Sequence, residues 1–199
     1  MLFGYDGAVR VGTDRKVVWE YRKPEYSYVH DGWILPDGNV MLSHAKGVVE
    51  VNPAKEVVWE FPLPRAISCQ PLPSGRVLVI DEGRRELIEV NRADKSVARR
   101  VSLAGSGLPQ VSGYRLGRQS ADGSYAVTNT DYHVKNLALA EIVAFGVSPD
   151  KKLLWTITRS ELLPQLENLS VDPGTGFKEL RHTHLQVLYP GWEKDVPVR

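Results

Sequence analysis

The sequence has a single cysteine, Cys69, so no intrachain disulfide can form. This removes one marker of an extracellular framework but does not establish a reducing compartment. The amino terminus has no basic region followed by an apolar stretch, and no run approaches the roughly 18 apolar residues of a membrane span. We therefore expect no signal peptide and no membrane segment in this chain, and the compartment stays open.

An excess of charge of one sign is also lacking. The 25 Lys and Arg residues are nearly matched by 24 Asp and Glu residues, and no basic run stands out, so no nucleic-acid partner is expected. Glycine-rich phosphate loops, CxxC pairs and serine-centred elbows are missing as well. The sequence therefore predicts no cofactor and no metal site. With 199 residues and 42% hydrophobic content, the chain is expected to fold as a soluble globular protein.

What the sequence does have is a repeat of about forty residues. A short run ending in Val-Val-Trp-Glu recurs at a spacing of forty, then in a weaker copy after another forty, then in a fourth copy displaced by sixteen residues. Every copy follows a second apolar run and a turn rich in Asn, Pro, Asp or Gly, as in a β-hairpin. The copies are Lys16–Glu20, Glu56–Glu60, Ser96–Arg100 and Lys152–Thr156, and the runs before them are Ala8–Val11, Val48–Val51, Leu87–Val90 and Ile142–Phe145.

A second repeated element lies upstream of these hairpins. Trp33–Leu42 is echoed by Gln70–Val79 and, in a third version, by Ser120–Val127. Each contains Asp-Gly or Ser-Gly between apolar segments, which favours a tight hairpin turn because glycine accepts positive φ at little cost. Two hairpins in about forty residues, repeated in tandem, predict an all-β fold: a β-propeller of four-stranded antiparallel blades, about four in number. The repeated Trp19, Trp59 and Trp155 are expected to pack between adjacent blades.

We interpret residues 1–199 as one propeller domain. Its intact blades are 28–61, 66–101 and 110–157, and segment 158–180 is a capping excursion. Segments 2–21 and 181–199 would pair as a composite blade that closes the ring. Two alternatives stay open: an open arc, whose exposed edges would favour a homodimer, and a fragment completed by other sequence.

Polar residues gather near the predicted starts of the inner strands, where propellers bind their ligands. His30 is the candidate catalytic residue because imidazole titrates near neutrality, although its neighbour Asp31 should face the opposite side of a strand. His182 and His184 share a strand face, but no third ligand accompanies them, so no metal site is assigned. Cys69 is typical of a buried apolar residue. The candidate ligand-binding residues are Asp31, Gln70, Tyr114, Arg115, His133, His182 and His184.

The Val-Val-Trp-Glu element after an Asn-Pro or Thr-Asp turn resembles the quinoprotein-like (PQQ-like) propeller repeats. The chain looks most like the six-bladed bacterial propeller proteins of unassigned function in that group, but it has about two blades fewer. A quinone cofactor is not expected, since no metal-plus-quinone pocket is recognisable. The segment His30–Val40 is also similar to arylsulfotransferase-type propellers. That likeness implies His30 as the sulfuryl acceptor, with Arg115 or His184 stabilising the anion.

Three functions are compatible with these features. The leading hypothesis is a non-catalytic propeller that binds a small molecule, a glycan or a protein at a polar channel mouth. The competing hypothesis is a transferase or lyase that uses His30, and the third is a structural propeller fragment or subunit. Convergence of His30, His184 and Arg115 on one cavity would favour the enzyme.

Overall fold

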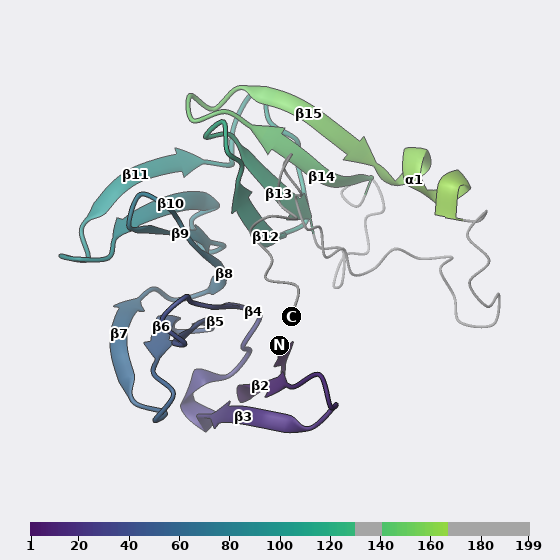
Figure 1. Cartoon of the computed structure of the whole chain (residues 1–199). Helices are drawn as coiled ribbons and strands as arrows, with labels where there is room; N and C mark the ends of the chain where they lie inside the picture. Colours follow the sequence, from purple (N-terminus) through teal and green to yellow (C-terminus); the bar gives the residue numbers. More distant parts are fainter. Residues whose placement is uncertain (130–140, 167–199) are drawn as a thin grey trace.

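Four antiparallel sheets follow one another along the chain in a computed structural model, which describes residues 1–129 and 141–166. Figure 1 shows the sheets placed around an arc, with β4, β8 and β12 towards its centre. The predicted all-β propeller with about four blades is therefore confirmed. Three sheets have four strands, and the first has three.

The strands occur in chain order within every sheet. The first blade holds β1 (Leu2–Phe3), β2 (Gly7–Val11) and β3 (Val17–Arg22), and a short 3-10 helix η1 (Pro24–Tyr26) leads to the second blade. The second holds β4 (Asp31–Ile34), β5 (Val40–His44), β6 (Gly47–Val51) and β7 (Val57–Pro62). The third holds β8 (Ala66–Pro71), β9 (Arg76–Asp81), β10 (Glu86–Asn91) and β11 (Val97–Ser102). The fourth holds β12 (Tyr114–Gln119), β13 (Tyr125–Asn129), β14 (Ile142–Val147) and β15 (Leu153–Thr158).

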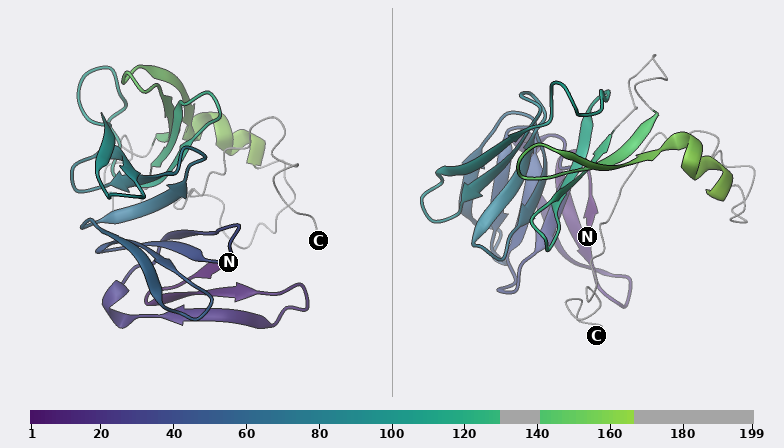
Figure 2. Two further views of the ribbon diagram at one scale, coloured as in Figure 1. Left: turned by 60° about the vertical axis from the view of Figure 1, so that its left-hand side comes forward. Right: turned by 90° about the horizontal axis from the view of Figure 1, so that it is seen from above.

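The helix α1 (Arg159–Leu166) follows β15 and extends away from the sheets (Figure 2). It begins the segment that we expected to cap the molecule, and the rest of that segment lies outside the described residues. No helix in the described ranges is long and apolar enough to cross a membrane. The composite blade depends on residues 181–199, which also lie outside the described part. Ring closure, and the homodimer expected of an open arc, therefore stay predictions.

Three apolar clusters hold consecutive blades together. Leu42 and Val49 pack with the first blade, Met41 and Val48 with the third, and the third and fourth blades share a cluster around Phe145. Each sheet thus buries both of its faces where it has neighbours on both sides, which is why β5, β6, β9 and β10 are buried along nearly their whole length. Trp19 and Trp59 pack at these interfaces, as the repeat predicts. Trp155 on β15 differs, since it is 38% exposed and belongs to none of the three clusters.

The outer hairpins repeat a specific backbone device. The residue two positions before each outer strand has positive φ in all four blades, and the strand register shifts at the start of that strand in each case, which is the pattern of a bulged hairpin turn. These residues are Arg15 (φ 65°), Lys55 (φ 70°), Lys95 (φ 62°) and Lys151 (φ 65°). A basic residue therefore occupies a position that glycine would occupy with less strain.

Lys151→Gly should raise the free energy of unfolding by about 0.5–1 kcal/mol, because glycine removes the cost of positive φ at this turn. Lys152 is the matched control, since it is also exposed but has ordinary φ, and Lys152→Gly should be neutral or destabilising. Urea unfolding of the two variants beside the parent measures both effects. Equal changes in the two variants would contradict the turn assignment.

Candidate functional site

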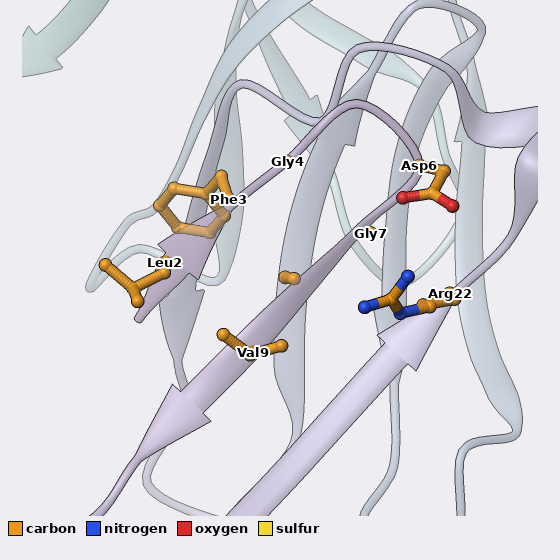
Figure 3. Close-up of a pocket in the computed structure, with 8 residues that line it drawn as sticks. Leu2, Phe3, Gly4, Asp6, Gly7, Val9 and Arg22 are labelled. Atoms are coloured by element: carbon orange, nitrogen blue, oxygen red, sulfur yellow. The ribbon is translucent and has the colours of Figure 1, made fainter. Parts of the chain in front are cut away.

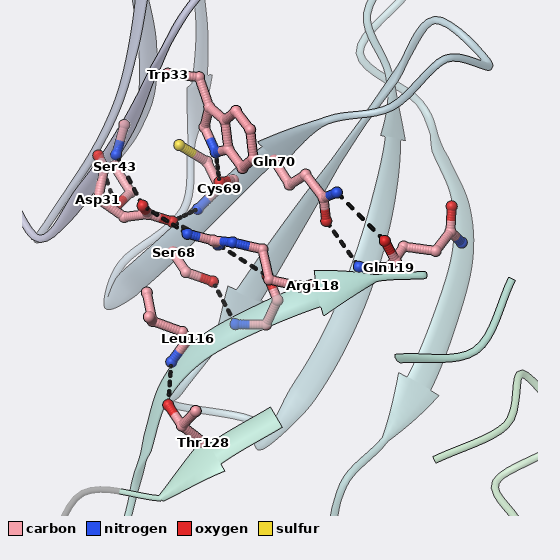
Figure 4. A network of polar contacts seen from close by, with 12 residues as sticks. Asp31, Trp33, Ser43, Ser68, Cys69, Gln70, Leu116, Arg118, Gln119 and Thr128 are labelled. Carbon is pink, nitrogen blue, oxygen red and sulfur yellow. Dashed lines mark hydrogen bonds and ion pairs between the residues drawn. The ribbon is translucent and has the colours of Figure 1, made fainter. Parts of the chain in front are cut away.

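Strands β4, β8 and β12 meet at the centre of the arc through a network of buried polar contacts (Figure 4). Asp31 at the start of β4 accepts hydrogen bonds from both terminal nitrogens of the Arg118 guanidinium on β12, at 2.8 and 2.9 Å. The same carboxylate accepts the backbone N–H of Cys69 on β8 at 3.1 Å and that of Gly32 at 2.9 Å. One side chain therefore connects the second, third and fourth blades.

The cation of this pair is also held in place by an aromatic ring. The Arg118 guanidinium carbon lies 5.2 Å from the centroid of Trp33, and the Trp33 indole N–H donates to the Cys69 carbonyl at 2.6 Å. A guanidinium over an indole face is an attractive arrangement, strengthened by exclusion of water. The Asp31 oxygens, the Arg118 guanidinium and the Trp33 indole all contact groups within this cluster. We therefore interpret the cluster as a structural contact that holds the blades together.

Gln70 and Tyr114, two predicted ligand-binding residues, are also engaged in packing contacts. The Gln70 side chain pairs with the backbone of Gln119, accepting at 2.7 Å and donating at 3.4 Å. Tyr114 is buried in the core, where its hydroxyl donates to the Leu103 carbonyl at 3.0 Å. Burial raises the pKa of Tyr114 above its ordinary value, although the charge of Arg85 opposes this. The ligand-binding role of Gln70 and Tyr114 stays a prediction that these contacts do not favour.

Cys69 is fully buried on β8, and burial raises the pKa of its thiol well above the ordinary value, with the Asp31 charge acting in the same direction. A thiol is a poor nucleophile because the thiolate is the reactive form. Cys69 is therefore a packing residue, as expected from the sequence. No group of three or more potential metal ligands occurs within the described ranges.

His30 lies just before β4 beside two exposed tyrosines. The ring of Tyr28 lies 5.8 Å from that of half-buried His30, nearly parallel to it, and makes an edge contact with Tyr5 at 4.6 Å. Tyr5 is 62% exposed and Tyr28 52% exposed. We call Tyr5, Tyr28, His30 and Arg115 the mouth, since they lie at or near the starting ends of the inner strands.

The tyrosine pair is held by the backbone. The Tyr28 N–H donates to the Tyr5 carbonyl at 2.6 Å, and Tyr28 has a φ of 61°. Arg65 has the same geometry one blade later, with φ 62° and an N–H bonded to the Ala45 carbonyl at 2.7 Å. The positive φ therefore belongs to the connection between blades, and it fixes which way the side chain of Tyr28 leaves the backbone.

Arg115 occupies in β12 the place that His30 occupies before β4. Each stands two residues before a glycine, Gly32 or Gly117, and strand pairing places these glycines opposite equivalent residues, Leu42 and Val127. Arg115 is half-buried, and the described residues give it no hydrogen-bond or ion-pair partner. His133, His182 and His184 lie outside the described residues, so the predicted convergence of His30, His184 and Arg115 stays untested.

Two buried glutamates at the blade interfaces, Glu50 and Glu89, were not predicted from the sequence. Glu50 on β6 accepts from Asn39 at 2.6 Å and pairs with Arg92 of the next blade. Glu89 occupies the same place on β10 and accepts from Arg76 at 2.9 Å and from Gln119 and Tyr125 of the next blade at 2.9 and 2.5 Å. A glutamate flanked by valine or isoleucine in two copies of one repeat is the signal that could have identified them.

His44 was also missed. It ends β5 in a buried position, stacks on Tyr26 with 4.1 Å between ring centres, and borders a cavity of about 220 Å³ that Phe61 also lines. Burial, assisted by the charge of Lys46, lowers the pKa of His44 to about 4. The imidazole is therefore neutral in the folded protein at pH 7.

His44 should make the protein acid-sensitive. Unfolded histidine binds a proton near pH 6.5, whereas folded His44 does so only near pH 4, so stability falls as the pH is lowered from about 6.5 to about 4. We expect a loss of about 2 kcal/mol across that window, which His44→Gln should remove. Urea unfolding at a series of pH values measures it. An unchanged pH profile in His44→Gln would contradict the assignment.

The four consecutive antiparallel sheets, with inner strands that converge on a polar centre, define the chain as a β-propeller. No known family model matches its sequence, and no relative is found among curated proteins.

Solved structures share the fold. A protein of unknown function from Bacteroides caccae is 15% identical with a TM-score of 0.52, over 78% of this chain and 76% of that one. A streptogramin B lyase is 12% identical with a TM-score of 0.53, over 75% and 47%. A catalytically inactive histidine-to-alanine variant of virginiamycin B lyase from Staphylococcus aureus, with quinupristin, is 15% identical with a TM-score of 0.52, over 76% and 48%. The chain spans about half the length of the two lyases.

These neighbours are β-propeller proteins and support the propeller fold that the repeat resemblance implies. At such low identity they support the fold alone. The quinoprotein-like subgroup stays a prediction.

Proposed function

We propose that the chain is a non-catalytic binding propeller that holds a sugar or another ring-shaped ligand at the mouth. The observation that carries the proposal is the exposed pair Tyr5 and Tyr28, locked edge to face and backed by His30. A flat aromatic face with a hydroxyl at its edge stacks on the apolar face of a sugar ring and bonds to its hydroxyls. Because the pair is already ordered by its backbone hydrogen bond, little conformational entropy is lost on binding.

The neighbouring polar groups fit a binding role better than a catalytic one. The Asp31 carboxylate accepts hydrogen bonds from Arg118 and two backbone N–H groups, so it holds the blades together rather than acting on a ligand. Arg115, at the equivalent position on β12, provides a cation that would suit a ligand carrying an acidic group. The mouth thus has a stacking surface and hydrogen-bond donors at Tyr5, Tyr28 and His30, and a positive charge on the fourth blade.

Tyr5→Ala and Tyr28→Ala should each weaken binding of p-nitrophenyl glycosides at least tenfold while lowering the melting temperature by only about 2–4 °C, the cost of the lost ring contact. Saturation-transfer NMR with a panel of such glycosides measures the binding. Trp155→Ala is the matched control because Trp155 is also an exposed aromatic residue, on β15 at 38%, and it should leave glycoside binding unchanged. Equal binding by all three variants would overturn the proposal.

A second candidate is a lyase that uses His30. It is favoured by one observation, the fold shared with two lyases, one of which is a catalytically inactive histidine-to-alanine variant with quinupristin. The test is incubation of the protein with quinupristin, followed by chromatography. Loss of intact quinupristin with the parent protein, and none with His30→Ala, would establish the lyase. Intact quinupristin in both would remove this candidate.

A further inference from the structure

The cavity of about 220 Å³ beside His44, which we call the His44 cavity, lies on the side of the second blade that faces the first. Strand pairing places His44 opposite Gly47 and Gly47 opposite Pro62, so these three residues share one face of the sheet. Val49 is the next residue on that face, and Tyr26 of η1 also lines the cavity. Because Gly47 has no side chain, space is left between its neighbours.

A second hollow, of about 150 Å³, lies beside β1 and differs in its chemistry (Figure 3). Leu2, Phe3 and Val9 supply its apolar wall, and the charged side chains that line it belong to Asp6 and Arg22. Neither of these two is buried, so water satisfies both. The His44 cavity, in contrast, is lined by a polar side chain that is only 3% exposed.

His44 has a ring nitrogen without a partner among the described residues. Its Nδ1 accepts the backbone N–H of Lys46 at 3.3 Å, and its ring stacks on Tyr26. Burial, assisted by the charge of Lys46, lowers the pKa of His44 to about 4, so the ring is neutral at pH 7 and its proton is on Nε2. An unpaired buried N–H is unfavourable. His44 therefore offers a donor to a molecule in the cavity.

The residues at the same place in the next two blades are satisfied by the protein. Strand β9 ends at Asp81, whose carboxylate accepts the backbone N–H of Arg84 at 2.9 Å. Strand β13 ends at Asn129, which accepts from the Ser112 hydroxyl at 2.9 Å and donates to a backbone carbonyl of β14 at 2.8 Å. The end of the second strand is thus polar in three blades, and His44 differs in having Nε2 available.

A positive charge lies beside this donor. Lys46, in the turn between β5 and β6, lines the cavity and is exposed, and no acidic residue in the described ranges forms an ion pair with it. A carboxylate can accept from an imidazole N–H and pair with an ammonium at the same time. The cavity is smaller than the roughly 300 Å³ at which pockets for drug-sized ligands begin, so it suits a single ring.

We propose that the His44 cavity binds a small aromatic carboxylate. The carboxylate group accepts from His44 Nε2 and pairs with the Lys46 ammonium. The ring of the ligand packs against the apolar surface of Tyr26, Val49 and Pro62. None of these residues belongs to the mouth, so this site is separate from the one proposed above.

Two acidic side chains set the orientation of the ligand. Glu60 lines the cavity, but its strand position is two residues from the His44 end, roughly 7 Å at about 3.3 Å per residue. Glu25 of η1 does not line the cavity and is paired with Lys23 at 3.5 Å. The carboxylate of the ligand therefore belongs at the Lys46 end, where a cationic group would be repelled.

The test compares four probes by NMR titration at pH 7: benzoate, acetate, benzyl alcohol and benzylamine. Benzoate should bind at least tenfold more tightly than each of the others, because acetate lacks the ring, benzyl alcohol lacks the charge and benzylamine has the opposite charge. Equal binding of the four probes, tighter binding of benzylamine, or no benzoate binding at millimolar concentration would overturn the proposal.

Lys46→Gln should weaken benzoate binding about fivefold, because it removes the ammonium. His44→Phe should weaken it at least tenfold, because phenylalanine keeps a stacking ring but has no N–H. Lys55→Gln is the control, since Lys55 is exposed on the same blade and does not line the cavity, and it should leave binding unchanged. Equal losses in the two lysine variants would overturn the proposal, and this comparison decides the matter if His44→Phe fails to fold.

Chemical shifts locate the bound probe. Benzoate should shift the ring resonances of His44 and Tyr26 and leave those of Tyr5 and Tyr28 unchanged. Shifts at the mouth with none at His44 would overturn the proposal. Glycoside binding at the mouth is measured with different probes, so failure of one site is distinguishable from failure of the other.

Discussion

Asp31→Ala should lower the free energy of unfolding by about 3–5 kcal/mol, a large share of the roughly 5–15 kcal/mol typical of a folded domain. The substitution leaves the largely buried Arg118 guanidinium without its counter-charge and the N–H groups of Gly32 and Cys69 without their acceptor. Because these groups come from three blades, we expect one cooperative transition at lower denaturant. Urea unfolding followed by tryptophan fluorescence measures the loss.

A double-mutant cycle separates the ion pair from simple loss of packing. Asp31→Ala, Arg118→Met and their combination should show a coupling energy of about 2 kcal/mol or more, because the second substitution removes a charge that the first one stranded. Strictly additive losses would show that the two side chains stabilise the blades independently. That result would contradict our interpretation that the Asp31–Arg118 ion pair holds the second and fourth blades together.

Glu89→Ala should cost about 3 kcal/mol, because it leaves the buried hydroxyl of Tyr125 without an acceptor and removes the partner of Arg76. Burial opposes ionisation of Glu89 most strongly, but hydrogen bonds from Tyr125 and Arg76 and the nearby charges outweigh it, so the pKa of Glu89 is lowered. Burial and the contact with Glu89 in turn raise the pKa of Tyr125 to about 12.

Glu86 is the matched control for Glu89, since it lies on the same strand and pairs with Arg100 near the surface at 2.8 Å. Glu86→Ala should cost less than about 1 kcal/mol, as exposed ion pairs do. Urea unfolding of both variants makes the comparison. Similar losses in the two variants would show that the third and fourth blades do not depend on the buried carboxylate.

The propeller could be predicted because its evidence is local and repeated. Turn residues and alternating apolar runs specify each hairpin, and the forty-residue period specifies the blade. Strand β1 of the first blade could not be predicted because Leu2–Phe3 is only two residues long. In the fourth repeat, the sequence pattern predicts residues 142–145 as the equivalent of Val48–Val51. The structure corrects this by two residues, because Val147 pairs with Leu153 as Val51 pairs with Val57.

The site was harder to predict because its contacts span large sequence separations. Asp31 could be named as a polar residue at an inner-strand start, but its partner Arg118 is 87 residues away, on the inner strand of another blade. Only the stacking of three blades brings the two together. Tyr5 and Tyr28 were not singled out since each is an isolated aromatic residue in a connection, and no repeat marks them.

The most direct test of the central claim is where on the protein a bound ligand perturbs the NMR spectrum. Titration of the isotopically labelled protein with the p-nitrophenyl glycoside that binds most strongly should shift the resonances of Tyr5, Tyr28 and His30. The amides of Gln70, Cys69 and Gln119 should stay unchanged, because those residues are engaged in fastening the blades. Shifts confined to the Asp31 and Arg118 network, with none at the two tyrosines, would contradict the account.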